Sequence, residues 1–341
     1  MRPPPVPLVP EFDLGGRNTL GLRSRARFGG VLNEEGQIVA AAQFAERAGL
    51  PFHLLGGGSN CVLADEIDAV VGIADLRGRR LERADGGVRI TAGAGEPWDE
   101  LVRWTVGLGI GGLENLAGIP GTAGAAPVQN IGAFGVELSD VVESVDVIDT
   151  ANWSPRRLTA PDCGFGYRYS RLKKEPGRFL VTGITLHLPA EWSPVLSHDG
   201  LGCCAYPSCP AEIMATVLAR RRARLPDWRT TGNAGSFFHN PVVSVAAASR
   251  IPEVSGRAVS GGVKLPAGKL LDLCGFRGKR RGGAAFCETN ALILFNVGGA
   301  TVADVDELAA SAQKAVRLRF GVDLVQEPSR VGNRGLIGGL N

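Results

Sequence analysis

Several kinds of feature are missing or scarce in this chain of 341 residues, and each absence narrows its class. No segment approaches the roughly 18 continuous apolar residues of a membrane-spanning helix. The start, Met1-Arg2-Pro3-Pro4-Pro5, lacks the apolar run of a secretory signal peptide. The net charge of +3 is too small to indicate nucleic-acid binding. No internal repeat of about 20–50 residues is present. We therefore expect a protein without membrane or nucleic-acid partners.

The pattern of the seven cysteines argues against a zinc site. No CxxC pair occurs, and the cluster Cys203, Cys204 and Cys209 has no nearby histidines in a zinc-finger pattern. Scattered thiols of this kind are typical of a reduced, cytosolic protein. We expect no metal site and a cytoplasmic location.

Glycine, in contrast, is abundant: the 48 glycines are about twice the usual share. They cluster in short loops, which is typical of backbone that approaches a ligand closely. The length favours two or three domains, and the 44% of apolar residues suffices for a core. The one dense basic run, residues 220–224, is interpreted mainly as a solvated helix face.

Periodicity and turn residues predict an α+β protein in which helices alternate with partly antiparallel strands. Residues 1–16 are predicted to be a disordered leader, and the glycine-rich tail 331–341 is predicted to fray. The predicted helices are 36–49, 96–106, 211–224 and 305–320. The predicted strands are 51–55, 61–72, two or three within 73–95, 145–148, 157–159, 179–188 and 322–325.

One familiar motif is misleading. Gly107, Gly109 and Gly112 satisfy GxGxxG, but a dinucleotide fingerprint must follow a strand and open a helix. The preceding residues 98–106 have the pattern of a helix. The match is therefore accidental, and it does not support a Rossmann domain.

Two other glycine-rich segments suit a long, polar ligand. In Gly56-Gly57-Gly58-Ser59-Asn60, successive backbone N–H groups can face one concavity and bind an anion such as a pyrophosphate. A tight turn between strands is an equally good interpretation of this loop alone. The segment 118–135 has almost no large side chains, so it cannot build a core, but Gln129 and Asn130 offer amide donors and acceptors.

These segments, in order, resemble those of a known enzyme family. The UDP-N-acetylenolpyruvoylglucosamine reductases have similar motifs along their whole length. The matching segments here are Gly56–Asn60, Ile119-Pro120-Gly121, Gln129-Asn130-Ile131-Gly132-Ala133, Tyr167-Arg168-Tyr169-Ser170, Gly235-Ser236-Phe237-Phe238-His239-Asn240-Pro241, Pro266–Asp272 and Glu327. The segment around Trp192–Leu196 resembles the longer subtype of the family.

The resemblance implies a two-part FAD-binding domain of the vanillyl-alcohol-oxidase (PCMH) type and a separate α+β substrate-binding domain. The expected boundaries are 1–16 for the leader, 17–72 and 73–224 for the two FAD-binding subdomains, 225–325 for the substrate-binding domain, and 326–341 for a C-terminal segment with the catalytic glutamate. Non-covalent FAD would be bound by Gly56, Gly57, Gly58, Ser59, Asn60, Ile119, Gly121, Gly124, Ala125, Gln129, Asn130, Ile131, Gly132 and Gly135.

The implied reaction is the NADPH-dependent reduction of UDP-N-acetylglucosamine enolpyruvate in peptidoglycan precursor synthesis. Arg168 would stabilise the carboxylate and enolate charge, Ser236 would donate a proton, and Glu327 would orient and polarise the enolpyruvyl group. Substrate contacts are expected from Tyr167, His198, Arg224 and Asn240, and the family is usually monomeric.

Three positions and one local segment depart from the family pattern. His198 stands in place of a tyrosine that closes over substrate, Arg224 and His239 each stand in place of a lysine, and the sequence before Glu327 is unusual. The catalytic trio is intact, so the departures concern the substrate. A paralogous flavoenzyme that reduces or oxidises a related enolpyruvyl or sugar substrate, and a non-enzymatic flavin-binding module, are the alternatives.

Overall fold

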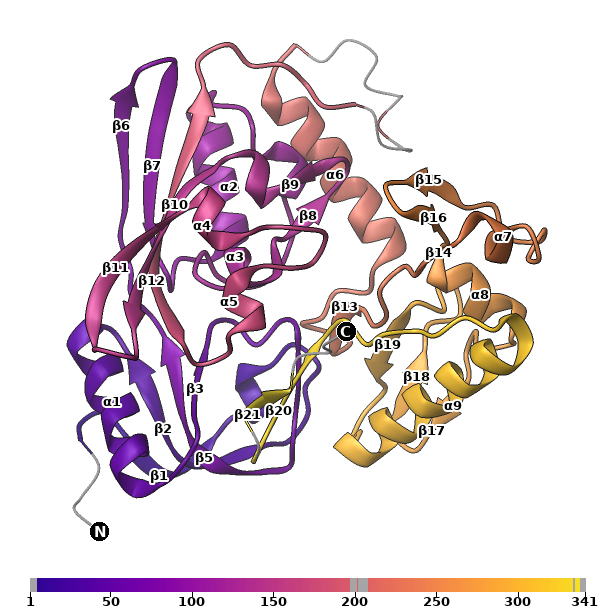
Figure 1. The fold of residues 1–341 in the computed structure, drawn as a ribbon, viewed down its shortest axis with the longest axis horizontal. Coiled ribbons are helices and arrows are strands. Elements are labelled where there is room, and N and C mark those ends of the chain that lie inside the picture. Colours follow the sequence, from indigo (N-terminus) through magenta and orange to yellow (C-terminus); the bar gives the residue numbers. More distant parts are fainter. Residues whose placement is uncertain (1–4, 197–200, 202–207, 334, 338–341) are drawn as a thin grey trace.

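The computed structural model describes residues 5–196, 201, 208–333 and 335–337, and the fold consists of three lobes (Figure 1). The first lobe is built on a four-stranded sheet in the order β1-β2-β5-β3, in which β1 is antiparallel to β2 and the other pairs are parallel. Its elements are β1 (Val9–Asp13), β2 (Arg25–Leu32), α1 (Glu35–Ala48), β3 (Phe52–Leu55), β4 (Cys61–Leu63) and β5 (Glu66–Ala74).

Helix α1 connects β2 to β3 and covers this sheet with one apolar face. Its buried residues, among them Ile38, Ala41 and Phe44, recur at helical spacing. The helix ends at Gly49, whose φ of 66° is the left-handed conformation that glycine adopts without steric cost. The predicted helix is thereby confirmed, and it aims the following strand at the loop that begins with Gly56.

The predicted disordered leader is wrong for residues 9–13, which form β1 at the sheet edge. Leu8 and Leu14 are buried on either side of the strand. Phe12 packs over Gly29 of β2, where an added Cβ would lie 2.4 Å from the phenylalanine ring. The prolines misled the prediction, but proline is tolerated in an edge strand, where its missing N–H costs no ladder bond.

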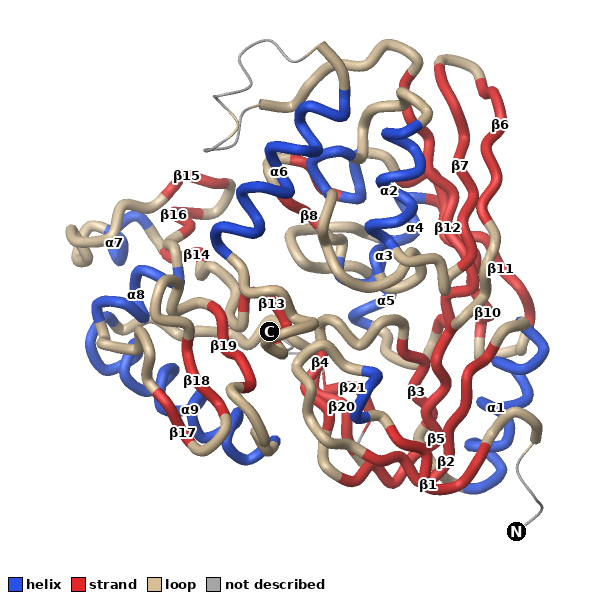
Figure 2. The backbone as a smooth tube through the Cα atoms, turned by 180° about the vertical axis from the view of Figure 1, so that it is seen from behind, coloured by secondary structure: helices blue, strands red, loops and turns tan. Residues whose placement is uncertain are grey.

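The second lobe is a five-stranded antiparallel sheet in the order β11-β10-β12-β7-β6. Helices lie on one of its faces (Figure 2) and enclose a core that includes Trp98 and Leu186. Its elements are β6 (Arg79–Ala84), β7 (Gly87–Gly93), α2 (Trp98–Gly107), α3 (Ala126–Gln129), β8 (Gly132–Ala133), β9 (Val136–Glu137), β10 (Val142–Asp149), β11 (Ser154–Thr159), α4 (Ala160–Cys163), α5 (Arg171–Lys174), β12 (Phe179–Pro189) and α6 (Pro210–Arg224). Gly107 ends α2, so GxGxxG follows a helix, as predicted.

The third lobe combines two small antiparallel sheets with the helices α7, α8 and α9. Four phenylalanines, at 237, 238, 276 and 286, are fully buried in its core, which also takes in Leu20 and Leu22 of the first lobe. Its elements are β13 (Asn233–Ser236), β14 (Val242–Val243), α7 (Val245–Ala248), β15 (Arg257–Val259), β16 (Gly262–Lys264), α8 (Ala267–Leu273), β17 (Arg280–Arg281), β18 (Ala284–Phe286), β19 (Ile293–Asn296) and α9 (Val302–Phe320).

After α9 the chain returns to the first lobe, so two further predictions are wrong. Residues 322–325 form no strand; Gln326 makes an isolated bridge to Phe238 instead. The predicted tail does not fray at 331–333 and 335–337, since β20 (Ser329–Gly332) pairs in parallel with β4 and antiparallel with β21 (Gly335–Ile337) (Figure 1). This docking fixes residues 326–328 between the lobes. No helix within the described ranges is long and apolar enough to cross a membrane.

His53 helps to hold this returning tail and should make stability depend on pH. The ring is buried, and its Nε2 lies 3.1 Å from the carbonyl oxygen of Gly332. Burial lowers the pKa of the ring from 6.5, so the unfolded chain binds the proton first as the pH falls. The free energy of unfolding should therefore decrease below about pH 6.5, by up to about 1.4 kcal/mol per pH unit for this proton.

The variant His53→Gln keeps an N–H donor for Gly332 but does not titrate. Urea unfolding measured from neutral to acidic pH should give a flatter dependence for this variant than for the unchanged chain. Equal slopes would mean that His53 takes up no proton on unfolding.

Candidate active site

The three lobes meet at a cavity of about 260 Å³ that holds most of the residues predicted to be functional. The first lobe contributes Ser59 and Asn60, and the third contributes Ser236 and Asn240. Glu327 reaches it from the returning tail. The remaining predicted residues in its lining come from the second lobe: Ile119, Gly121, Ala125, Gln129, Ile131, Gly132, Tyr167 and Arg168.

An adjoining hollow of about 100 Å³ extends the cavity toward the first lobe. Thr122 and Ala125 line both spaces, and Gly56 and Gly124 line the smaller one. Two connected spaces beside glycine loops suit a ligand with two ends, as the spacing of the loops predicts.

The glycine loop after β3 lies directly against the second glycine segment. An added Cβ at Gly57 would lie 3.0 Å from the Cα of Gly121, and one at Gly56 would lie 2.3 Å from Thr122 Oγ1. Gly58 has a φ of +59°, and its Cβ would meet the Arg17 carbonyl oxygen at 2.1 Å. Gly57 and Gly58 are therefore required by close approach of backbone to backbone, and Gly56 by the Thr122 side chain, besides any ligand.

The chemistry of the lining fits FAD. Thr122 Oγ1 and Gln129 Nε2 are buried and make no hydrogen bond to the described part of the chain. Such atoms are costly unless a ligand or water satisfies them. Clustered backbone N–H groups and Ser59 suit a pyrophosphate, and the small side chains leave room for a flat ring system. The residues that would hold FAD are therefore present together.

Replacing Gly57 with Val should weaken flavin binding while leaving most of the fold intact. The branched side chain would force the loop away from Gly121, and we expect FAD affinity to fall at least about tenfold, which is about 1.4 kcal/mol. Flavin absorbance per protein and the circular dichroism of the purified variant would measure this. Gly36→Ala, in α1 where nothing lies within 4 Å of the added Cβ, is the control and should stay yellow. A yellow Gly57→Val would contradict the assignment of this loop.

Some predicted cofactor residues support the site rather than face it. Asn130 is fully buried, and its side chain bonds Glu137, Ser139 and the Gly166 carbonyl oxygen. Gly135, at φ +87°, turns the chain between β8 and β9. Both shape the loop whose neighbouring residues line the cavity.

Arg168 and Glu327 form a half-buried pair at the cavity. Arg168 Nε donates to Glu327 Oε1 at 3.0 Å, and Nη2 donates to the Gly132 carbonyl oxygen at 2.7 Å. Burial raises the pKa of Glu327, and the charge of Arg168 opposes that rise. Arg168 has a φ of +53°, a conformation that non-glycine residues adopt rarely and mostly where function requires it.

Ser236 ends β13 and lies on the opposite lobe from Arg168. Its hydroxyl makes no hydrogen bond to any described residue, so it is free to donate to a ligand. Asn240 lines the same wall, where its Oδ1 accepts the backbone N–H of Ala267. The segment Gly235–Pro241 therefore presents one hydroxyl to the cavity and anchors itself through its amide.

Arg224, predicted to contact the substrate, lies away from the cavity. Arg224 is exposed at the end of α6 and does not line the cavity, whereas Arg221 does. Arg221 Nε donates to the Gly118 carbonyl oxygen at 3.1 Å, and burial lowers the pKa of its guanidinium to about 10. The signal was available: Arg221 continues the buried series Ile213 and Val217 at a spacing of four. His198 lies outside the described residues.

Two lysines near Arg168 were not predicted. Lys264 Nζ lies 3.3 Å from the centroid of the Tyr167 ring, a cation–π contact at the cavity edge. Lys173 Nζ donates to the Arg168 carbonyl oxygen at 3.2 Å. Burial lowers the pKa of both ammonium groups. With Arg168 they make this wall cationic, which suits an anionic ligand.

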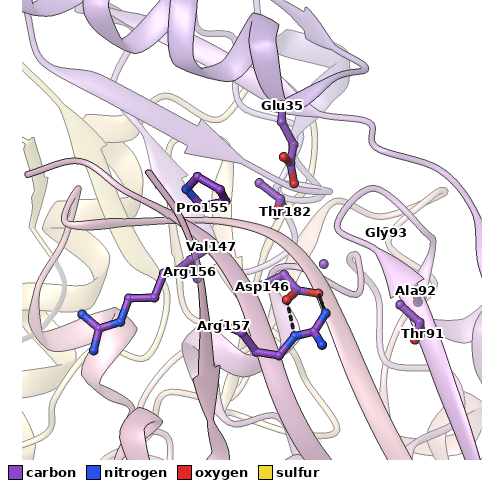
Figure 3. Close-up of a pocket in the computed structure, with 11 residues that line it drawn as sticks. Glu35, Thr91, Ala92, Gly93, Asp146, Val147, Pro155, Arg156, Arg157 and Thr182 are labelled. Atoms are coloured by element: carbon purple, nitrogen blue, oxygen red, sulfur yellow. Dashed lines mark hydrogen bonds and ion pairs between the residues drawn. The ribbon is translucent and has the colours of Figure 1, made fainter. Parts of the chain in front are cut away.

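Size alone does not identify the site. A hollow of about 520 Å³ lies on the outer face of the second sheet, beside the start of α1 (Figure 3). Its main charged groups satisfy each other, since Arg157 Nε donates to Asp146 Oδ1 at 2.7 Å. It has neither the glycine loops nor the unpartnered polar atoms of the central cavity.

Comparisons with known proteins agree with this geometry. Residues 31–152 match the FAD binding domain family, and residues 227–331 match the C-terminal domain of UDP-N-acetylenolpyruvoylglucosamine reductase. An FAD binding domain joined to this cavity defines a flavin-dependent oxidoreductase. The predicted fold class, a two-part FAD-binding domain with a separate α+β domain, is confirmed.

The family follows from relatives along the whole chain. The chain is 43% identical over 338 residues to the UDP-N-acetylenolpyruvoylglucosamine reductase of Burkholderia vietnamiensis (strain G4 / LMG 22486), covering 95% of this chain and 97% of that protein. The reductase of Paraburkholderia xenovorans (strain LB400) is 44% identical over 331 residues, covering 93% and 96%. The chain belongs to the UDP-N-acetylenolpyruvoylglucosamine reductase family.

A solved structure supports the fold independently. The crystal structure of the UDP-N-acetylenolpyruvylglucosamine reductase (MurB) from Thermus caldophilus superposes with a TM-score of 0.67 at 24% identity. The match covers 95% of this chain and 97% of that one. The arrangement of three lobes around the cavity is therefore that of the family.

Proposed function

We propose that this protein reduces the enolpyruvyl ether of UDP-N-acetylglucosamine enolpyruvate to UDP-N-acetylmuramate, with non-covalently bound FAD and NADPH as the hydride donor. The names of its relatives supply the reaction, and the convergence of Arg168, Glu327 and Ser236 on one cavity is the observation that carries it. We place the activity in the cytoplasm, in a monomer, in peptidoglycan precursor synthesis.

Most of the predicted cofactor residues line one or the other of the two neighbouring spaces. Ser59, Thr122 and the backbone of Gly56–Gly58 would hold the pyrophosphate, and Gln129 and Ile131 would lie nearer the reacting end. Arg221, whose Nε donates to the Gly118 carbonyl oxygen, would add a buried positive charge beside the second glycine segment. Bound FAD would accept a hydride from NADPH and deliver one to the terminal methylene carbon of the enolpyruvyl ether.

The protein must then stabilise the negative charge on the substrate and supply one proton. Hydride addition leaves negative charge that spreads into the substrate carboxylate, and the guanidinium of Arg168 can stabilise it. The carbon next to the carboxylate needs a proton, which the unpartnered hydroxyl of Ser236 would donate. Glu327, with its raised pKa, would bear a proton toward the enolpyruvyl group and orient it. Tyr167, Asn240 and Lys264 would contact the sugar nucleotide.

Consumption of the two co-substrates tests this proposal against another flavin enzyme of the same fold. The FAD-loaded chain should oxidise one NADPH for each UDP-enolpyruvyl sugar that it reduces, and only slowly without the sugar. A sugar oxidase would instead consume oxygen with the sugar and ignore NADPH. That second pattern would overturn the proposal while leaving the flavin site intact.

A further inference from the structure

His239 lies next to Glu327 although the proposed reaction does not use it. The segments 237–239 and 325–327 run side by side, because His239 N donates to the Val325 carbonyl oxygen and Glu327 N donates to that of Phe237, both at 2.9 Å. This pairing sets His239 Nδ1 3.6 Å from Glu327 Oε2. A shift of about 0.7 Å would bring the two atoms to hydrogen-bond distance.

The ring has no other partner for this nitrogen. The His239 side chain is 18% exposed, and its Nδ1 is buried without a hydrogen bond to any residue in the described ranges. Arg168 bonds Glu327 Oε1, and Oε2 is the carboxyl oxygen that faces the histidine ring, at 3.6 Å from Nδ1. A hydrogen bond between this buried ring nitrogen and the buried carboxyl oxygen would satisfy both atoms and so stabilise the protein.

The surrounding charges decide the form of the ring. Burial and then the cations Lys173, Arg168 and Lys264 lower the pKa of His239 to about 4, so the ring is neutral at neutral pH. The other ionisable groups that bear on this cluster are Tyr167, Glu137 and Arg257. A neutral imidazole carries one N–H donor and adds no charge.

Building on the proposed function, we propose that His239 is a positioning residue for Glu327. The neutral ring of His239 donates its Nδ1–H to Glu327 Oε2 and holds the carboxyl toward the cavity. Glu327 then faces the three cations Arg168, Lys173 and Lys264. A protonated His239 ring would be a fourth. A carboxyl beside fewer cations keeps its proton to higher pH. A neutral N–H donor stabilises the ionised carboxyl less than a cation at this position would, so the pKa of Glu327 stays higher than it would beside a fourth cation.

The test changes the charge at this position and follows the proton on Glu327. In the full chain loaded with FAD, infrared spectra titrated with pH would show the protonated carboxyl, assigned by its loss in Glu327→Gln. His239→Lys should lower the pKa of Glu327 by about one unit or more. His239→Gln, which keeps a neutral N–H donor, should leave it within about half a unit. His187→Lys, on the outer face of the second sheet, is the control for an added lysine elsewhere.

An unchanged Glu327 titration in His239→Lys, or equal shifts in His239→Lys and His239→Gln, would overturn the proposal. The kinetics give a second readout: the pH profile of flavin reoxidation by the sugar should move to lower pH in His239→Lys. A uniform loss of rate at every pH would indicate a merely structural role and would also overturn it. Failure of the unchanged chain to reduce the sugar would contradict the proposed function alone, since the infrared titration still decides the role of His239.

Discussion

Replacing Ser236 with Ala should slow reoxidation of the reduced flavin by the enolpyruvyl sugar about 10²–10⁴-fold, the usual contribution of a positioned acid. The hydroxyl lies at the cavity and bonds no described residue, so its removal breaks no structural contact. Bleaching of the flavin by NADPH needs no proton from Ser236 and should stay within about twofold. Stopped-flow measurement of the two half-reactions separates these effects.

Ser249→Ala provides the matched control. Ser249 is exposed on the third lobe, and its hydroxyl bonds only the Ala246 carbonyl oxygen. Both half-reactions should be unaffected. If the flavin of Ser236→Ala is reoxidised as fast as that of the unchanged chain, the proton comes from another group. A non-enzymatic flavin-binding module would also show no effect of this substitution.

Arg168→Lys should cost at least about a hundredfold in the same reoxidation step, although the charge is kept. A lysine cannot donate to Glu327 and to the Gly132 carbonyl oxygen at once, as the guanidinium does from Nε and Nη2. Loss of one well-aligned donor to developing negative charge typically costs about 10²–10³ in rate. The hydrogen bond from Arg168, which lowers the pKa of Glu327, is lost as well, so that pKa should rise.

The nearby Arg171→Lys separates this effect from a general loss of local structure. Arg171 lies in α5, three residues on, where its partly exposed guanidinium pairs with Glu175 and lies 4.9 Å from the centroid of the Phe179 ring, away from the cavity lining. Its replacement should leave both half-reactions within about twofold. Equal rates for Arg168→Lys and the unchanged chain would remove Arg168 from the reaction and leave it as a structural ion pair.

The residues that could be predicted from the sequence are those whose type is dictated by local geometry. Glycine at 58 is favoured by a local property of the loop, its positive φ of +59°, whereas the close approach of Gly57 to Gly121 depends on a distant segment. Helix α1 and its end at Gly49 follow from apolar spacing and a left-handed cap. Such features are readable because the physical cause and the residue are adjacent in the sequence.

The features that escaped prediction depend on partners far along the chain. β1 is stabilised by pairing with β2, and the tail by pairing with β4, so neither has a strong signal of its own. Lys264 reaches the site only because the third lobe folds over Tyr167. The predicted boundaries of the domains, and the roles of the site residues, stay predictions that the experiments above address.

The central claim is that one site binds FAD, accepts a hydride from NADPH and passes it to the enolpyruvyl sugar. An anaerobic visible spectrum of the purified protein tests all three parts in sequence. We expect a flavin spectrum that bleaches with NADPH and recovers when the UDP-enolpyruvyl sugar is added. Bleaching without recovery would contradict the substrate, and a protein that takes up no flavin even from added FAD would contradict the account from the glycine loops upward.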